Sequence, residues 1–176
     1  MAIADINSLY SELMDELDTT NDKEEWFDRY RAVTATMRGY DLDAPETLQD
    51  YFSREERTRL YRVVQAEIGD EYSFDQKCHV ASVIFNRWEY YGECSLNDVL
   101  VANQFSSIRD ERYKRVEVSD TTIKACEFAF EIEDTTYGAF FFDSDGSQNY
   151  RLIMNDGAHN FYALPRSKEK KKDNEK

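Results

Sequence analysis

The chain has 176 residues, of which 41% are hydrophobic, and this length and composition fit one globular domain with a possible appendage. Its formal net charge of −14 argues against general nucleic-acid binding, which depends on cationic neutralisation of phosphates. No apolar stretch approaches the length of a membrane span, so membrane insertion is not expected.

The first part of the chain, residues 1–50, has the pattern of an acidic helical hairpin. Apolar residues at three- and four-residue spacing predict an amphipathic helix over residues 3–18. A second helix is expected to begin after a cap at Asn21 or Asp22 and to end near Gly39. We expect this appendage either to pack on the main domain or to bind a protein partner.

Two capping boxes predict the helices that follow. Ser53 is followed three residues later by Glu56, and Ser73 by Gln76, so each pair can satisfy two helix N–H groups reciprocally. Gly69 should end the first of these helices. Shorter apolar patterns predict two more helices, near residues 95–100 and 119–130.

The pattern changes after residue 136. Aromatic and aliphatic runs bounded by turn residues predict short strands, at residues 137–142, 150–154 and 160–164. The fold class is therefore α+β, mostly helical, with a small antiparallel sheet late in the chain. The basic residues 166–176 are expected to form a disordered tail.

Glu67 is the first candidate for catalysis because it ends an apolar helical turn, Val63-Val64-Gln65-Ala66-Glu67. The negative end of a helix dipole and apolar neighbours both favour a protonated carboxyl, as a general acid requires near neutral pH. A solvated glutamate at a helix end would have the same local sequence, so the residue alone leaves both interpretations open.

No metal site is expected. The three cysteines lack CxxC or CxH spacing, and His79 and His159 lie far apart in the sequence. Cys78 and Cys126 occur in apolar helical surroundings, which predicts buried reduced thiols.

Five blocks follow one another over about a hundred residues: LYRVVQAEIGDE, HVASVIFNR, NQFSSIRD, YGAFFF and AHNFYA. Together they resemble the SleB family of cell wall hydrolases, which includes spore-cortex-lytic enzymes and phage lysins. The resemblance covers residues 54–165. It implies a peptidoglycan-cleaving domain at 51–165 with a compact lysozyme-like fold and no metal or organic cofactor.

The same resemblance assigns residues to the site. The catalytic glutamate of the family corresponds to Glu67. Gln104 and Ser106 match a Q-F-S block at the substrate cleft and could hydrogen-bond sugar groups. His159 matches an H-x-F block, where it either lines the cleft or bonds to the backbone of a turn. Asn86 matches an N-R pair and is expected to tie its helix to a loop.

The sequence departs from the family in two places. Relatives often carry Tyr and then Asn after the G-A pair, whereas this chain has Phe142 and Asp143, so Tyr137 or Tyr162 would have to supply a sugar-binding phenol. Phe142 is expected to line the cleft as an apolar group. The segment after Glu67 is also about one residue longer than in many relatives, which makes Glu71 an alternative acid.

The family resembles lytic transglycosylases, which implies cleavage between N-acetylmuramic acid and N-acetylglucosamine with 1,6-anhydromuramoyl products. A hydrolytic muramidase using Asp70 or Asp75 stays open, as does a lysozyme-like module that binds without cleaving. The N-terminal residues lack the basic and apolar regions of a signal peptide. We therefore expect synthesis in the cytoplasm and action at the cell wall, as a phage lysin or virion component.

Overall fold

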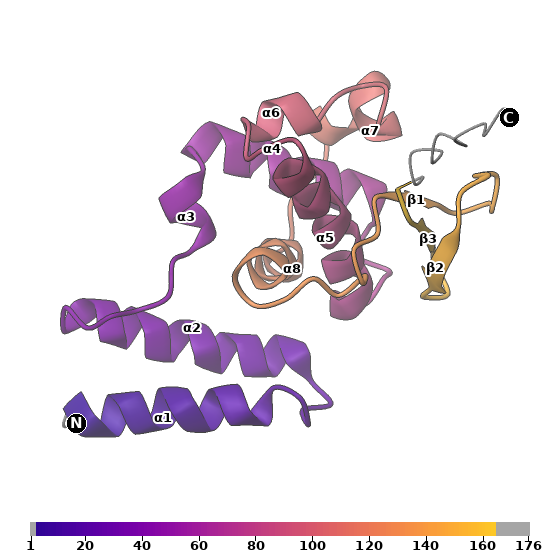
Figure 1. The fold of residues 1–176 in the computed structure, drawn as a ribbon. Coiled ribbons are helices and arrows are strands. Elements are labelled where there is room, and N and C mark those ends of the chain that lie inside the picture. The colour runs from indigo at the N-terminus through magenta and orange to yellow at the C-terminus, as the bar shows by residue number, and fades with distance from the viewer. Residues whose placement is uncertain (1–2, 165–176) are drawn as a thin grey trace, which may run out of the picture.

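The computed structural model describes residues 3–164. The elements before the sheet are α1 (Ile3–Glu16), α2 (Lys23–Gly39), α3 (Leu48–Tyr51), α4 (Arg54–Glu67), α5 (Phe74–Tyr90), α6 (Leu96–Val99), α7 (Ser106–Arg109), the 3-10 helix η1 (Arg112–Lys114) and α8 (Asp120–Glu131). The strands are β1 (Phe141–Asp143), β2 (Leu152–Asn155) and β3 (Asn160–Tyr162). The predicted α+β class, mostly helical with a late sheet, is confirmed (Figure 1).

Both predicted capping boxes are present. The Ser53 hydroxyl accepts from the Glu56 N–H at 3.2 Å, and the Glu56 carboxylate accepts from the Ser53 N–H at 3.0 Å. Ser73 and Gln76 make the equivalent pair at the start of α5. These caps fix where α4 and α5 begin, and Gly69 follows the end of α4 as expected.

The main core lies between α4, α5 and α8, and α6 also packs against α4 and α5. Val64, Ile84 and Cys126 are each fully buried there. Cys78 is fully buried in a second cluster, and both thiols are free, as the sequence predicted. Burial raises the pKa of each thiol, so neither is a reactive thiolate near neutral pH.

The helical hairpin packs on the main body rather than standing free. Trp26 and Phe27 of α2 are fully buried and meet the edge of the Phe128 ring of α8, with centroids 6.1 and 5.6 Å apart. The Trp26 indole N–H also donates to the Leu13 carbonyl at 2.8 Å, which ties α1 to α2. Figure 1 shows α1 and α2 lying side by side below the other helices.

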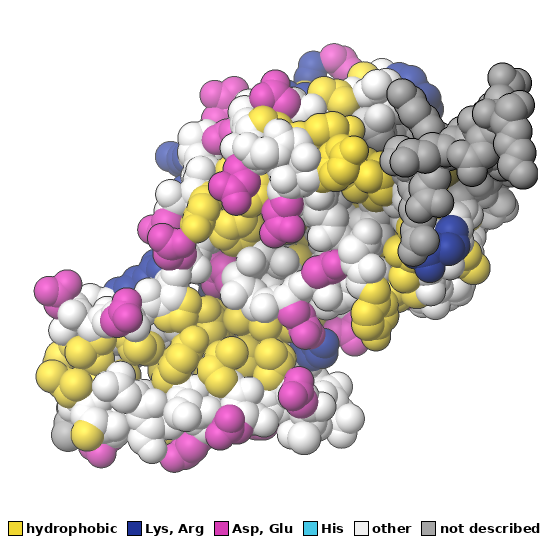
Figure 2. All heavy atoms as spheres, in the orientation of Figure 1, with side chains coloured by type: hydrophobic (Ala, Val, Ile, Leu, Met, Phe, Trp, Pro, Cys, Tyr) yellow, Lys and Arg dark blue, Asp and Glu magenta, His cyan; other side chains and the backbone are white. Residues whose placement is uncertain are grey.

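The surface carries the acidic character of the composition. Acidic side chains are scattered over the face in Figure 2, and hydrophobic side chains gather in a band between α1 and α2. No helix among residues 3–164 combines the length and apolar character needed to cross a membrane.

The sheet has the order β1-β3-β2, and both pairings are antiparallel. The strands are shorter than predicted, and β1 begins only at Phe141. Tyr137 and Gly138 have φ values of 55° and 79°, so the chain turns there instead of extending. The Asp134 carboxylate holds this turn by accepting from the Gly138 N–H at 2.5 Å. The predicted tail, residues 166–176, lies outside the described residues.

Candidate functional site

Glu67 is the last residue of α4, where the helix gives way to an extended residue. Ile68 has φ −139° and ψ 104°, and its N–H still bonds to the Val64 carbonyl at 2.9 Å. The Ile68 side chain is fully buried, whereas Glu67 is half-buried. The buried side chains of Val64 and Ile68, before and after Glu67 in the chain, therefore hold the Glu67 carboxyl at the surface of the core.

A backbone amide binds the Glu67 carboxyl. The Ser107 N–H, in the first turn of α7, donates to Glu67 Oε1 at 2.9 Å. Among the described residues this is the one hydrogen-bond donor to the carboxyl, so Oε2 stays available to a ligand. The start of α7 is fixed by Phe105, which is 1% exposed and lies under the Arg87 guanidinium, 5.2 Å from the ring centroid.

Glu67 lines an open depression of about 410 Å³ between the ends of α4 and η1. The residues around it come from two stretches of the chain, 65–72 and 112–116: Gln65, Ala66, Glu67, Gly69, Glu71, Tyr72, Arg112, Arg115 and Val116. Glu71 is exposed, and its carboxylate folds back over Gly69, where a Cβ would lie 2.3 Å from the Glu71 oxygen. The depression therefore holds two carboxylates, the predicted acid and its alternative.

Arg112 connects the walls of this depression. Its guanidinium donates to the Ser106 hydroxyl at 2.9 Å and to the Ala66 carbonyl at 3.3 Å. Asp110 accepts from Arg112 Nε at 2.8 Å and orients the side chain. Ser106, predicted to bind sugar, is half-buried beside Glu67, and its hydroxyl already accepts a bond from Arg112.

A buried polar network supports the helix end beneath Glu67. The ammonium of Lys77, 1% exposed, donates to the Ile68 carbonyl at 3.2 Å and to the Thr122 hydroxyl at 2.9 Å. Gln65 Oε1 accepts from the Thr122 hydroxyl at 2.6 Å. Because buried polar groups are costly to leave unpaired, this network fixes the end of α4 against α5 and α8.

Phe142 and His159 lie together on one face of the sheet. Their rings are 5.3 Å apart and perpendicular, and Phe142 also lies 6.4 Å from Phe105. Tyr72, at the rim of the Glu67 depression, has its ring 6.3 Å from His159. The sheet thus brings two of the predicted residues next to the loop that holds Glu67.

His159 is 8% exposed, and its Nδ1 has no hydrogen-bond partner among residues 3–164. Burial lowers the pKa of His159, although the negative charges of Asp156, Glu67 and Asp143 oppose this shift. The ring is therefore neutral near pH 7 and close enough to Glu67 to feel its charge. The backbone N–H of His159 donates to the Asp156 carboxylate at 2.8 Å, but the ring takes no part in that bond. Both sequence-based roles of the ring, lining the cleft or bonding to a turn, therefore stay predictions.

Tyr162 and Gln104 are placed differently from the other candidates. Tyr162 pairs with Phe141 and so points to the opposite face of the sheet from Phe142. Its hydroxyl donates to Asp143 at 2.9 Å, and burial, reinforced by this bond, raises the pKa of Tyr162 to about 12. Gln104 is exposed just before Phe105, with its side chain at the surface.

Tyr137 is 84% exposed in the turn before the sheet. Asn86 behaves as predicted for a helix tie, because its amide donates to the Ala139 carbonyl at 2.9 Å and to Asp134 at 3.2 Å. Its neighbour Arg87 donates to the Phe140 carbonyl at 2.7 Å. The N-R pair thus anchors α5 to the loop that leads into the sheet.

Two solved structures share the fold of this chain. One is the catalytic domain of the germination-specific lytic transglycosylase SleB from Bacillus anthracis, with a TM-score of 0.56, 18% identity and coverage of 65% of this chain and 99% of that domain. The other is the catalytic domain of SleB from Bacillus cereus, with a TM-score of 0.54, 18% identity and coverage of 63% and 91%. This chain has the fold of a SleB catalytic domain.

No protein-family model and no curated protein matches the sequence. The superposition nevertheless covers nearly all of each of those catalytic domains, and about a third of this chain lies outside it. The fold that the motif blocks implied is therefore confirmed.

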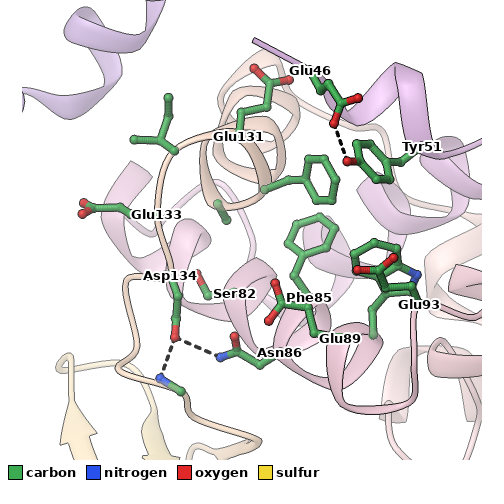
Figure 3. A pocket seen from close by; sticks show the side chains of 15 residues that line it. Glu46, Tyr51, Ser82, Phe85, Asn86, Glu89, Glu93, Glu131, Glu133 and Asp134 are labelled. Atoms are coloured by element: carbon green, nitrogen blue, oxygen red, sulfur yellow. Dashed lines mark hydrogen bonds between the residues drawn. The ribbon is translucent and has the colours of Figure 1, made fainter. Parts of the chain in front are cut away.

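A larger cavity of about 610 Å³ lies elsewhere on the SleB fold, between α5 and α8 (Figure 3). Aromatic residues, among them Phe85 and Trp88, line it together with acidic residues such as Glu89 and Glu131. Of the residues proposed from the sequence it contains only Asn86, which is bonded to the loop. Because it lacks Glu67, we assign the functional site to the smaller depression.

Sequence reasoning missed Ser107, Arg112 and Lys77. Ser107 acts through its backbone, which carries no side-chain signal. Arg112 follows Glu111, whose φ of 60° creates the turn that directs the arginine back to α4. Lys77 did leave a signal, because it lies on the buried face of α5 one turn before Ala81, where a lysine needs a partner.

Proposed function

We propose that this chain cleaves the glycan strands of peptidoglycan with Glu67 as the proton-transferring group. The observation that carries the proposal is the Glu67 carboxyl itself, half-buried in an open depression and bound through one oxygen by the Ser107 N–H. The backbone bond fixes the direction of the carboxyl, and general acid–base catalysis requires such a positioned group. The fold, shared with two SleB catalytic domains, supports the same reaction class.

In the proposed reaction, Glu67 gives its proton to the glycosidic oxygen between N-acetylmuramic acid and N-acetylglucosamine, and the C1–O bond breaks. The Glu67 carboxylate then takes the proton of the C6 hydroxyl of the muramoyl sugar while O6 bonds to C1. The product is a 1,6-anhydromuramoyl end, and Glu67 is protonated again. No water enters, so one carboxyl suffices for both steps.

Closing the ring requires O6 to react before water does. An aligned intramolecular nucleophile has an effective molarity of roughly 10⁵ M or more, far above that of bulk water. Phe142 packs against the buried Phe105, two residues before the Ser107 amide that bonds Glu67. Its ring offers water no strong hydrogen-bond partner, which favours the intramolecular route.

Glu71 gives the hydrolytic alternative its one specific support. It lines the same depression as Glu67, and glycoside hydrolysis usually uses two carboxylates on either side of the bond. Asp70, proposed from the sequence for this role, instead accepts from Gln65 at 3.1 Å and lies 3.4 Å from the Lys77 ammonium. A hydrolytic muramidase would therefore use Glu71 to activate water.

Mass spectrometry of the products from purified peptidoglycan tests both reactions. Wild type should release muropeptides with anhydro ends, one water lighter than hydrolytic products. Glu67→Gln should lower the rate by ~10²–10⁴-fold, whereas Glu71→Gln, at the same depression, should leave the anhydro product unchanged. Cleavage by Glu67→Gln at the wild-type rate would reject the proposal. Reducible ends that disappear in Glu71→Gln would establish hydrolysis instead.

A further inference from the structure

A basic groove runs along α4 beside the Glu67 depression. It is a hollow of about 520 Å³ lined by Arg54, Glu55, Thr58, Arg59, Arg62 and Tyr113. The lining contains three arginines and one glutamate, which gives it a net charge of +2 (3 − 1). This sign is opposite to the net charge of −14 of the whole chain.

The groove leads into the proposed site. Arg59, Arg62 and Ala66 follow one another at three- and four-residue spacing and so lie on one face of α4, and Ala66 already lines the Glu67 depression. The opposite wall is also shared, because Tyr113 of η1 lines the groove while Arg112 and Arg115 line the depression. The two hollows therefore form one path along α4 and η1.

The arginines of this path differ in the contacts that they make within the protein. Arg59 donates to the Leu100 carbonyl at 2.8 Å and lies 5.7 Å from the Tyr113 ring centroid. Arg54 and Arg62 are exposed, and neither forms a salt bridge within residues 3–164. Local structure does not explain Arg54, because a cation in the first turn of a helix opposes the helix dipole.

We propose that this groove, with Arg54 and Arg62 as its exposed cations, binds the anionic groups of cell wall polymers and guides the glycan strand to Glu67. The inference rests on the proposed function. Guanidinium groups form paired hydrogen bonds with both carboxylate and phosphate, the two anions that a wall presents through its stem peptides and its phosphate-bearing polymers. A positive path also attracts a polyanion that the rest of this acidic surface repels.

Binding to insoluble walls tests the groove without requiring catalysis. Co-sedimentation is measured in the Glu67→Gln background, where the polymer stays intact, at low and at high salt. Arg54→Gln/Arg62→Gln should weaken binding by about tenfold at low salt, from two exposed ion pairs, and the difference should shrink at high salt. Arg109→Gln/Arg151→Gln is the matched control, because both arginines are exposed, lie outside the groove and form no salt bridge within residues 3–164.

Two treated substrates identify the anion. Hydrofluoric acid strips the phosphate polymers from walls, and an amidase frees glycan strands of their peptides, so the two substrates separate phosphate from carboxylate. The groove is supported if the difference in binding between the groove variant and the control is lost on either substrate. Equal binding by the groove variant and the control would overturn the inference even if Glu67-dependent cleavage is observed. So would a groove-dependent affinity for duplex DNA without one for walls. Failure of the proposed function would be seen separately, because the wild-type protein would then release no cleavage products from peptidoglycan.

Discussion

The backbone nitrogen of Ser107 lies 2.9 Å from Oε1 of Glu67, and this bond joins the first turn of α7 to the last residue of α4. The position of the carboxyl therefore depends on a four-residue helix whose start is held by the buried Phe105. Phe105 in turn packs against Phe142 of the sheet and the guanidinium of Arg87. Distant blocks of sequence thus meet around one carboxyl oxygen.

Ser107→Pro removes the amide donor to Glu67 and should lower peptidoglycan cleavage by roughly tenfold or more, because a hydrogen bond to a charged group is worth about 1.5–3 kcal/mol. Ser107→Ala is the control, since it keeps the N–H and deletes only a buried hydroxyl without a partner among the described residues. We expect it to retain activity and stability. Rates of cleavage and thermal unfolding of both variants give the answer, and an active Ser107→Pro would contradict it.

Arg112→Gln should reduce activity by about tenfold, because glutamine cannot reach Ser106, Ala66 and Asp110 together. Lys114→Gln is the matched control in the same 3-10 helix, because the one ion pair of Lys114 within residues 3–164 is with the exposed Glu111. Exposed pairs of that kind contribute about 0–1 kcal/mol. Comparable losses in the two variants would show that charge, rather than the three bonds, accounts for the effect.

The helices of this fold were predictable because their signals are local. Ser53 with Glu56 and Ser73 with Gln76 fixed the starts of α4 and α5, and the periodic apolar residues gave the buried faces. The start of β1 was not predictable in this way, because the left-handed turn at Tyr137 depends on hydrogen bonds to the Asp134 side chain.

The candidate site was predictable only in part. The motif blocks predicted Glu67, Phe142 and His159, and the structure places Phe142 and His159 near the loop whose amide bonds Glu67. Their roles stay predictions. Tyr162 was expected beside them, but strand alternation turns it to the other face of the sheet. The Arg112 bonds depend on how η1 packs against α4, which no short stretch of sequence encodes.

The hairpin should contribute strongly to stability. Trp26→Ala should lower the free energy of unfolding by about 3–5 kcal/mol, the usual range for a large aromatic residue in a core. Leu9→Ala on α1, where Leu9 is 43% exposed, should cost less than about 1 kcal/mol. Urea unfolding of both variants is the measurement. Similar midpoints for Trp26→Ala and wild type would mean that the hairpin unfolds separately from the domain.

Glu131 should make stability depend on pH. Burial raises its pKa to about 7, although the Leu48 N–H, which donates to Glu131 Oε1 at 3.2 Å, lowers it in part. The folded state thus holds this proton more tightly than the unfolded chain, where the ordinary value is 4.5. Its contribution to stability is full below pH 4.5 and is lost as the pH rises through 7.

Glu131→Gln removes the charge but keeps an oxygen that can accept from Leu48. At pH 8 it should raise the free energy of unfolding above that of wild type by about 1–3 kcal/mol, and below pH 4.5 the difference should vanish. Glu89→Gln, exposed at the same cavity, should give a curve parallel to wild type. Urea titrations between pH 4 and about 8 compare the three proteins. If Glu131→Gln and wild type differ by the same amount at every pH, the pKa of Glu131 is the same in the folded and unfolded protein, and burial does not raise it.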